Sequence, residues 1–103
     1  MEKIANLRDI KAGGSLTFDY KGEKAIVVRT KEDQLVAYVA LCPHAGGTIE
    51  WDEQINKLLC ETHLSLFNAE DGAVCRHSSA FEVRDGLNRI ELKVDEDQNI
   101  FAL

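Results

Sequence analysis

The chain has little of several residue types, and each shortage argues against a class of protein. One proline and three cysteines occur in 103 residues, so the composition indicates neither a proline-rich linker nor a disulfide framework. The 12 basic residues are outnumbered by 18 acidic ones. This balance argues against a nucleic-acid binder, because such a protein needs a basic face. It favours a soluble protein whose charged partners, if it has them, are basic.

Long apolar segments are also missing. The longest uninterrupted apolar run, Leu35 to Cys42, has eight residues, whereas a membrane-spanning helix needs about 20. The first residues, Met1 to Asn6, lack the apolar segment of a secretory signal. We therefore expect one cytoplasmic domain over residues 1–103, without membrane attachment.

Strand patterns account for much of the sequence. Segments of alternating or β-branched residues are separated by short turns of charged residues and glycine, without helical periodicity. These patterns predict an all-β chain, folded as an antiparallel β sandwich or small barrel. The predicted strands are residues 15–20, 25–29, 35–41, 81–84, 89–94 and 100–103. Residues 6–11 fit either a turn or a short helix.

The middle of the chain, residues 42–77, has broken strand signals and contains all three cysteines and all three histidines. Here Cys42-Pro43-His44 is followed, after fifteen intervening residues, by Cys60-Glu61-Thr62-His63. Thiolate and imidazole are ligands of zinc, iron and iron–sulfur clusters. Two ligands of each type do not by themselves distinguish between these metal centres.

Both motifs begin where a strand signal ends. Residues 35–41 run directly into Cys42, and residues 57–59 run directly into Cys60. Pairing between these two strands would place the two ligand-rich loops side by side. Loops of this kind carry function when a rigid scaffold holds them.

The order and spacing of the two motifs resemble the Rieske [2Fe–2S] signature, and the resemblance extends over essentially the whole chain. It implies a Rieske-like fold with a cluster-binding subdomain of two loops, at about residues 42–47 and 60–67. In such a protein the cysteines bind one iron and the histidines bind the other. The implied ligands are Cys42, His44, Cys60 and His63, and the implied cofactor is one [2Fe–2S] cluster per chain.

The resemblance also implies a one-electron carrier rather than an enzyme. Small ferredoxins of this type typically pass electrons from a flavin-containing reductase to a terminal oxygenase, and the chain is too short for an added catalytic domain. A Rieske-like small subunit of an assimilatory nitrite reductase is the alternative. Two interpretations are open for the acidic residues expected around the two loops: a solvated face, or a surface that also steers a basic partner. These residues are Glu50, Asp52, Glu53 and Glu61.

Departures from the high-potential members of this family bear on the reduction potential. The positions that carry an additional disulfide in those members are Gly47 and Thr62 here. Ser65 matches a serine that donates to sulfur, whereas Phe67 stands where those members have a tyrosine hydroxyl. We therefore expect a potential in the lower half of the Rieske range of roughly −150 to +300 mV.

A zinc-stapled β domain is a third interpretation, because Cys75 and His77 form another ligand pair. Together with Cys60 and His63 they have a permissible spacing for structural zinc. This interpretation is weaker because it leaves the first motif unused. Under the Rieske interpretation, Cys75 is a small buried residue and His77 lies on the surface. Trp51 is expected to pack in the core or against a loop rather than to face a partner.

Overall fold

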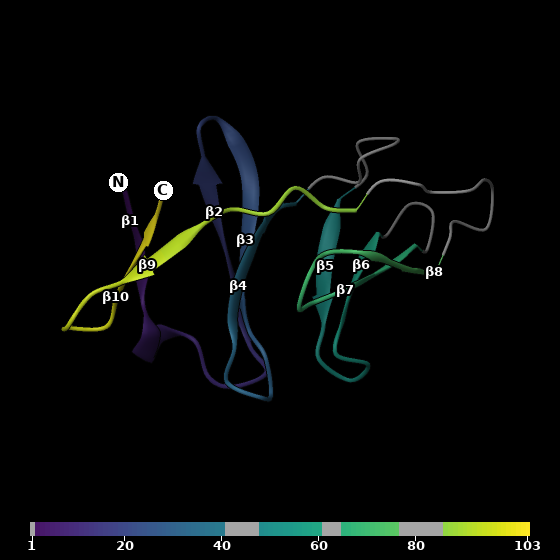
Figure 1. The fold of residues 1–103 in the computed structure, drawn as a ribbon, viewed down its shortest axis with the longest axis horizontal. Helices are drawn as coiled ribbons and strands as arrows, with labels where there is room; N and C mark the ends of the chain where they lie inside the picture. Colours follow the sequence, from purple (N-terminus) through teal and green to yellow (C-terminus); the bar gives the residue numbers. More distant parts are fainter. Residues whose placement is uncertain (1, 41–47, 61–64, 77–85) are drawn as a thin grey trace.

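The computed structural model describes residues 2–40, 48–60, 65–76 and 86–103 (Figure 1). They form strands β1 (Glu2–Asn6), β2 (Ser15–Tyr20), β3 (Glu23–Arg29), β4 (Leu35–Val39), β5 (Ile49–Asp52), β6 (Lys57–Cys60), β7 (Leu66–Asn68), β8 (Val74–Arg76), β9 (Leu92–Val94) and β10 (Asn99–Ala102), with the 3-10 helix η1 (Leu7–Asp9) after β1. The strands make three antiparallel sheets, in the orders β1-β10-β9, β2-β3-β4 and β5-β6-β7-β8. The prediction of an all-β antiparallel fold is confirmed.

The sheet β2-β3-β4 is the middle layer of three (Figure 1). One face, with Val27 and Ala37, packs against the sheet β1-β10-β9. The other face, with Ile26 and Val36, packs against the four-stranded sheet β5-β6-β7-β8. Residues 25–28 of β3 are all buried, because both faces of this strand are covered. Burial on both faces explains why β3 is a continuous apolar run rather than an alternating one.

The strands with strong local patterns lie close to their predicted positions. The predictions over 15–20, 25–29 and 35–41 correspond to β2, β3 and β4, and the last prediction corresponds to β10. The prediction over 89–94 is wrong in its first half, because only β9 is a strand there. Before β9, the backbone instead bonds to β4, where Ile90 N–H donates to Ala37 O at 2.9 Å. The strand predicted over 81–84 lies outside the described residues.

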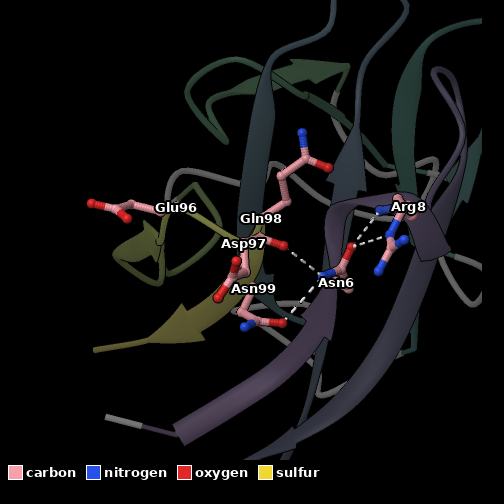
Figure 2. Close-up of a pocket in the computed structure, with 6 residues that line it drawn as sticks. All are labelled: Asn6, Arg8, Glu96, Asp97, Gln98 and Asn99. Atoms are coloured by element: carbon pink, nitrogen blue, oxygen red, sulfur yellow. Dashed lines mark hydrogen bonds between the residues drawn. The ribbon is translucent and has the colours of Figure 1, made fainter.

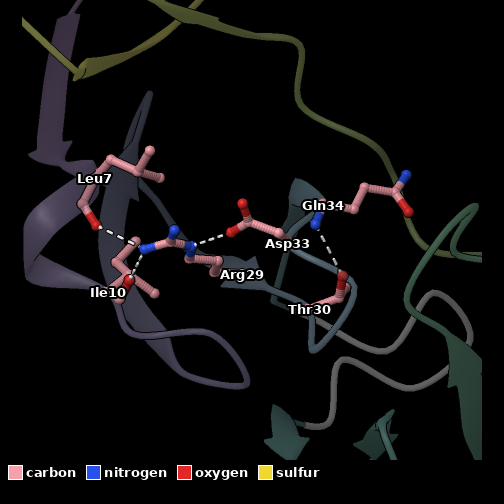
Figure 3. A network of polar contacts seen from close by, with 6 residues as sticks. All are labelled: Leu7, Ile10, Arg29, Thr30, Asp33 and Gln34. Atoms are coloured by element: carbon pink, nitrogen blue, oxygen red, sulfur yellow. Dashed lines mark hydrogen bonds and ion pairs between the residues drawn. The ribbon is translucent and has the colours of Figure 1, made fainter.

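We call the two three-stranded sheets together with η1 the base. Arg29 ties its parts together, because its guanidinium donates to the carbonyl oxygens of Leu7 (3.4 Å) and Ile10 (2.9 Å) and pairs with Asp33 at 2.6 Å (Figure 3). The hydroxyl of buried Thr30 accepts the backbone N–H of Gln34 at 3.0 Å. The base therefore satisfies these buried polar groups with its own residues.

Asn6 joins η1 to the hairpin between β9 and β10. Its amide donates to Asp97 O (3.0 Å) and Asn99 Oδ1 (3.1 Å), while its oxygen caps η1 by accepting Arg8 N–H at 3.0 Å (Figure 2). An open, polar pocket of about 470 Å³ lies at this junction. The hairpin lies at the opposite side of the molecule from the four-stranded sheet (Figure 1), so this pocket belongs to the base. None of the helical structure in the described ranges is long and apolar enough to cross a membrane.

Candidate metal centre

The described residues that flank the two sequence motifs meet at one end of the four-stranded sheet. Ile49, shortly after the first motif, is paired with Cys60, which opens the second. The N–H of Ile49 donates to Ala40 O at 3.2 Å, so the chain entering the first motif is bonded to the chain leaving it. The N–H of Cys60 donates to Ser65 O at 2.9 Å, which does the same for the second motif. Both motifs are therefore attached to the scaffold at neighbouring points.

The expected pairing between residues 35–41 and 57–59 is wrong, because the two strands belong to different sheets. β4 lies in the middle sheet, and its neighbour there is β3. β6 lies in the four-stranded sheet between β5 and β7. The described residues that flank the motifs are instead brought together by the β5–β6 pair and by the stacking of the two sheets. This arrangement depends on contacts between distant segments, which local sequence patterns do not report.

Among the implied ligands, the structure describes Cys60. It ends β6, and its side chain is fully buried in the apolar cluster between the middle sheet and the four-stranded sheet. Cys75 is placed by its backbone in β8. The remaining motif residues considered from the sequence lie outside the described residues: Cys42, His44, Gly47, Glu61, Thr62, His63 and His77.

The surroundings of Ser65 indicate whether the described residues fit an iron–sulfur group. It is bonded to Cys60 and continues the β6–β7 register, so the two side chains are cross-strand neighbours on the buried face. Ser65 is fully buried, and its hydroxyl has no hydrogen-bond partner within the described part of the chain. An unsatisfied buried hydroxyl costs about 1–3 kcal/mol. A buried thiol beside a hydroxyl that needs an acceptor fits a centre that contains sulfur.

Two aromatic residues of the four-stranded sheet have packing roles. Phe67 is fully buried and pairs with Leu58 on the face toward the middle sheet. Trp51 packs against the same cluster, and its indole N–H donates to Gly13 O at 2.8 Å. The packing role predicted for Trp51 is confirmed.

Tyr38 of β4 locks the four-stranded sheet onto the base. Its ring is fully buried between the sheets, and its hydroxyl donates to Ala69 O, in the β7–β8 turn, at 2.6 Å. Burial raises the pKa of this phenol to about 12, with the Arg89 charge opposing the shift. The turn fits against the ring because Gly72 has no side chain, and a Cβ there would lie 2.7 Å from Tyr38 Cε1. Since the first motif connects β4 of the middle sheet to β5 of the four-stranded sheet, this contact holds the attachment points of that motif in place.

The acidic residues expected around the two loops lie at different ends of the four-stranded sheet. Glu50 is exposed and lies next to Ile49, near the end of the sheet where the motifs attach. For Asp52 and Glu53 the prediction is wrong, because Asp52 pairs with Lys57 at the other end of β5. Only Glu50 remains close to the motif-bearing end among the described acidic candidates.

The family model for the Rieske [2Fe-2S] domain matches residues 1–89. The chain belongs to this family. Its cofactor is accordingly a [2Fe–2S] cluster, and the chain is an electron carrier. When bound, such a cluster accepts and releases one electron. Family membership favours the cluster over the zinc interpretation.

Two curated relatives are iron–sulfur subunits of the cytochrome b6-f complex. The chloroplastic subunit of Arabidopsis thaliana is 34% identical over 62 residues, which are 58% of this chain and 27% of the relative. Subunit 2 of Synechocystis sp. is 34% identical over 56 residues, or 52% of this chain and 31% of the relative. The chain thus matches about a quarter to a third of the length of these relatives.

Solved structures have the same fold at lower identity. The plasma membrane Rieske protein PetC3 from Synechocystis PCC 6803 has a TM-score of 0.83 and 24% identity, covering 100% of this chain and 99% of that chain. The ferredoxin of carbazole 1,9a-dioxygenase from Nocardioides aromaticivorans IC177 has a TM-score of 0.77 and 23% identity, covering 98% and 94% respectively. These similarities establish the Rieske fold for nearly the whole chain.

Proposed function

We propose that the chain carries electrons one at a time from a flavin-containing reductase to a terminal oxygenase. The observation that carries this proposal is its nearly complete mutual coverage, 98% and 94%, with the ferredoxin of a carbazole dioxygenase. The chain also matches 27% of a chain in the carbazole-bound oxygenase and ferredoxin complex of carbazole 1,9a-dioxygenase, with a TM-score of 0.78 and 21% identity. We also propose that it works as a single cytoplasmic domain.

The proposed ligands are Cys42 and Cys60 on one iron and His44 and His63 on the other. The chain supports them by burying Cys60 at the end of β6 and by pairing β6 with β5. Ser65 supplies a buried hydroxyl beside Cys60, available to donate to cluster sulfur. Such a hydrogen bond stabilises the added negative charge of the reduced state and raises the potential.

The ligand set is tested by reconstituting the chain with iron and sulfide and recording absorption and EPR spectra of the reduced protein. We expect a red-brown protein with a low average g value. Cys42→Ser and His44→Ala should abolish the Rieske spectrum, because each removes one ligand.

Cys75→Ser and His77→Ala are matched controls, since they remove the same chemical groups from the second ligand pair. Both variants should keep the spectrum. The zinc interpretation predicts a colourless protein without a Rieske spectrum, whose bound zinc is lost in these two variants. Loss of the spectrum in the Cys75 or His77 variant, with retention in the Cys42 and His44 variants, would contradict the proposed ligands.

The partner assignment is tested with the oxygenase and reductase encoded nearest to the gene for this chain. Substrate turnover by that pair should require the chain and stop when it is omitted. The purified chain should also be stable and monomeric. A chain that is stable only when bound to a large nitrite reductase would support the alternative and contradict the oxygenase assignment.

A further inference from the structure

The base and the four-stranded sheet are joined by hydrogen bonds at two separate places. At one of them, the hydroxyl of Tyr38 donates to Ala69 O in the β7–β8 turn at 2.6 Å. At the other, the indole N–H of Trp51 on β5 donates to Gly13 O, in the loop before β2, at 2.8 Å. β5 and β8 are the outer strands of the sheet, whose order is β5-β6-β7-β8. The two hydrogen bonds therefore hold opposite edges of this sheet.

The acceptor of the Trp51 hydrogen bond is itself bonded to the middle sheet. Gly13 N–H donates to Arg29 O at 2.7 Å, and Arg29 N–H donates to Gly14 O at 3.0 Å. Arg29 ends β3, and its guanidinium holds the segment around η1 (Figure 3). Both backbone polar groups of Gly13 are thus used, the N–H toward β3 and the oxygen toward Trp51. The indole therefore fixes β5 against β3 through a single residue.

Packing beside this hydrogen bond is incomplete, which increases its importance for β5. A cavity of about 170 Å³ is lined by Ser15 and Thr17 of β2 and by residues 49–51 of β5. Side chains that border a cavity lose the dispersion contacts they would make in a filled interior. A sheet held firmly at one edge can turn about that edge. A hydrogen bond at the opposite edge, from Trp51 to Gly13, prevents this turn.

β5 is also the strand that connects the two motifs. The loop expected for the first motif ends at residue 47, and β5 begins two residues later, at Ile49. Ile49 is the register partner of Cys60, the first residue of the second motif. Trp51 and its register partner Leu58 lie on the same, inward face of the sheet. The side chains that point outward at this end of the sheet are Glu50, Leu59 and Leu66. A displacement of Trp51 therefore moves the strand that holds the first motif beside the second.

We propose that Trp51 is a positioning residue for the [2Fe–2S] cluster, because its indole N–H fixes β5 and thereby the place of the first motif relative to Cys60. This inference rests on the proposed ligands, two of which lie in the first motif. Trp51 acts through the backbone of β5 and not by binding the cluster. Two loops that supply ligands to one cluster must keep a fixed separation, and residues outside the ligand set maintain that geometry.

Two replacements of Trp51 remove the hydrogen bond, and the chain has no other tryptophan. Trp51→Phe removes the indole N–H and keeps an aromatic ring in the apolar cluster. Replacement by benzothienylalanine keeps both rings and has sulfur in place of the N–H. Tyr20→Phe is the matched control, because it removes a hydrogen bond of the same length, 2.8 Å, from an aromatic side chain to the backbone oxygen of Leu103 within the base.

The reconstituted holoproteins are compared by EPR of the dithionite-reduced state and by the rate at which a chelator removes iron from the oxidised state. Both Trp51 variants should lose iron about fivefold faster, the factor expected for one hydrogen bond when release requires local opening. Their EPR lines should broaden and shift, because the ligands then take a range of positions around the irons. Tyr20→Phe should match the unmodified protein in both measurements.

The outcomes separate the positioning role from the proposed ligands. If the unmodified chain binds no cluster, the proposed ligands are wrong, and the positioning role is wrong with them. If it binds the cluster and both Trp51 variants keep its EPR lines, the positioning role alone is wrong. Faster iron loss with unchanged EPR lines also overturns the role, because the hydrogen bond would then only stabilise the fold. Equal effects of Tyr20→Phe would overturn it too. If Trp51→Phe does not fold, the benzothienylalanine variant decides.

Discussion

The base and the four-stranded sheet bury polar groups in different ways. Among the described residues, each contains one fully buried serine or threonine, Thr30 in the base and Ser65 beside β7. Thr30 accepts a backbone N–H from Gln34 at 3.0 Å, whereas the Ser65 hydroxyl has no partner within the described ranges. The Thr30 hydroxyl is therefore satisfied by protein, while the site beside Cys60 has a donor that suits an acceptor supplied by a cofactor.

The two regions also differ in how they are stabilised. Strands β2, β3 and β4 have five to seven residues, and β5 to β8 have three or four. The four-stranded sheet shares its apolar cluster with the middle sheet, as Leu58 and Phe67 pack with Ile26 and Val36. Its stability thus depends on the base and, we expect, on the bound cluster.

The largest expected effect is the response to removal of iron and sulfide. Backbone amides of β6, such as that of Leu58, should lose at least about 1,000-fold of their hydrogen-exchange protection, because metal binding stabilises the short strands. Amides of β3, such as that of Val27, should change less than about threefold. Hydrogen exchange with mass spectrometry compares the two regions directly. Equal loss in both strands would show that the cluster supports the whole chain alike.

Gly72→Ala tests how much the contact between the base and the four-stranded sheet stabilises the protein. Gly72 has φ +73°, and an added Cβ would lie 2.7 Å from the buried ring of Tyr38. Backbone strain and overpacking together should lower the free energy of unfolding by about 3 kcal/mol. Gly22→Ala is the control, because Gly22 has φ +86° but open space around it. That variant should lose about 1 kcal/mol, and equal losses in urea unfolding would contradict the packing argument.

Tyr38→Phe keeps the ring and removes only the hydroxyl that bonds to Ala69 O. The buried carbonyl then lacks this donor, and the free energy of unfolding should fall by about 1–2 kcal/mol. Folding raises the Tyr38 pKa from its ordinary value of 10.0 to about 12. The contribution of the protonated Tyr38 hydroxyl to the free energy of unfolding is therefore fully present below pH 10. It is lost as the pH rises toward 12.

Denaturant unfolding between pH 10 and pH 12 should show a smaller fall in the free energy of unfolding for Tyr38→Phe than for the unmodified protein. Tyr20→Phe is a control in the base, where a partly buried hydroxyl donates to Leu103 O at 2.8 Å. Its loss of stability at neutral pH should be the smaller of the two. A Tyr38→Phe protein as stable as the unmodified one would show that the hydroxyl does not hold the two regions together.

The smallest expected effect is that of replacing the buried hydroxyls of Ser65 and Thr30. Ser65→Ala should lower the reduction potential by about 40 mV, which corresponds to one hydrogen bond of about 1 kcal/mol for a one-electron couple. Thr30→Val should leave the potential unchanged and lower the free energy of unfolding by about 1 kcal/mol. Voltammetry and urea unfolding of both variants provide the comparison. An unchanged potential in Ser65→Ala would mean that this hydroxyl does not donate to the cluster.

Strands with a strong local pattern were predictable, and short strands with a weak pattern were not. Alternation in residues 15–20 and the apolar run of β3 are local signals, and a short turn joins the two strands. β1 gave no such signal, and its pairing with β10 at the other end of the chain appears only in the structure. Most of β5 to β8 also went unrecognised, since strands of three or four residues carry little periodicity.

Some features of the candidate site were likewise predictable from the sequence, and others were not. The spacing of the two motifs was visible in the sequence, and so was the serine beside the second motif. The burial of Ser65, its register with Cys60 and the role of Tyr38 were not visible. Each depends on which side chains face each other across sheets, and residue type alone does not specify this.

Residue identity and spacing by themselves determined that this is an all-β Rieske chain, because ligand chemistry and strand periodicity are local properties. Only the tertiary structure decided that the strands flanking the first motif belong to two stacked sheets, and that Leu59 and Leu66 form an outward pair beside Cys60. The physical reason is that sheet stacking and strand register follow from burying apolar surface between segments far apart in the chain.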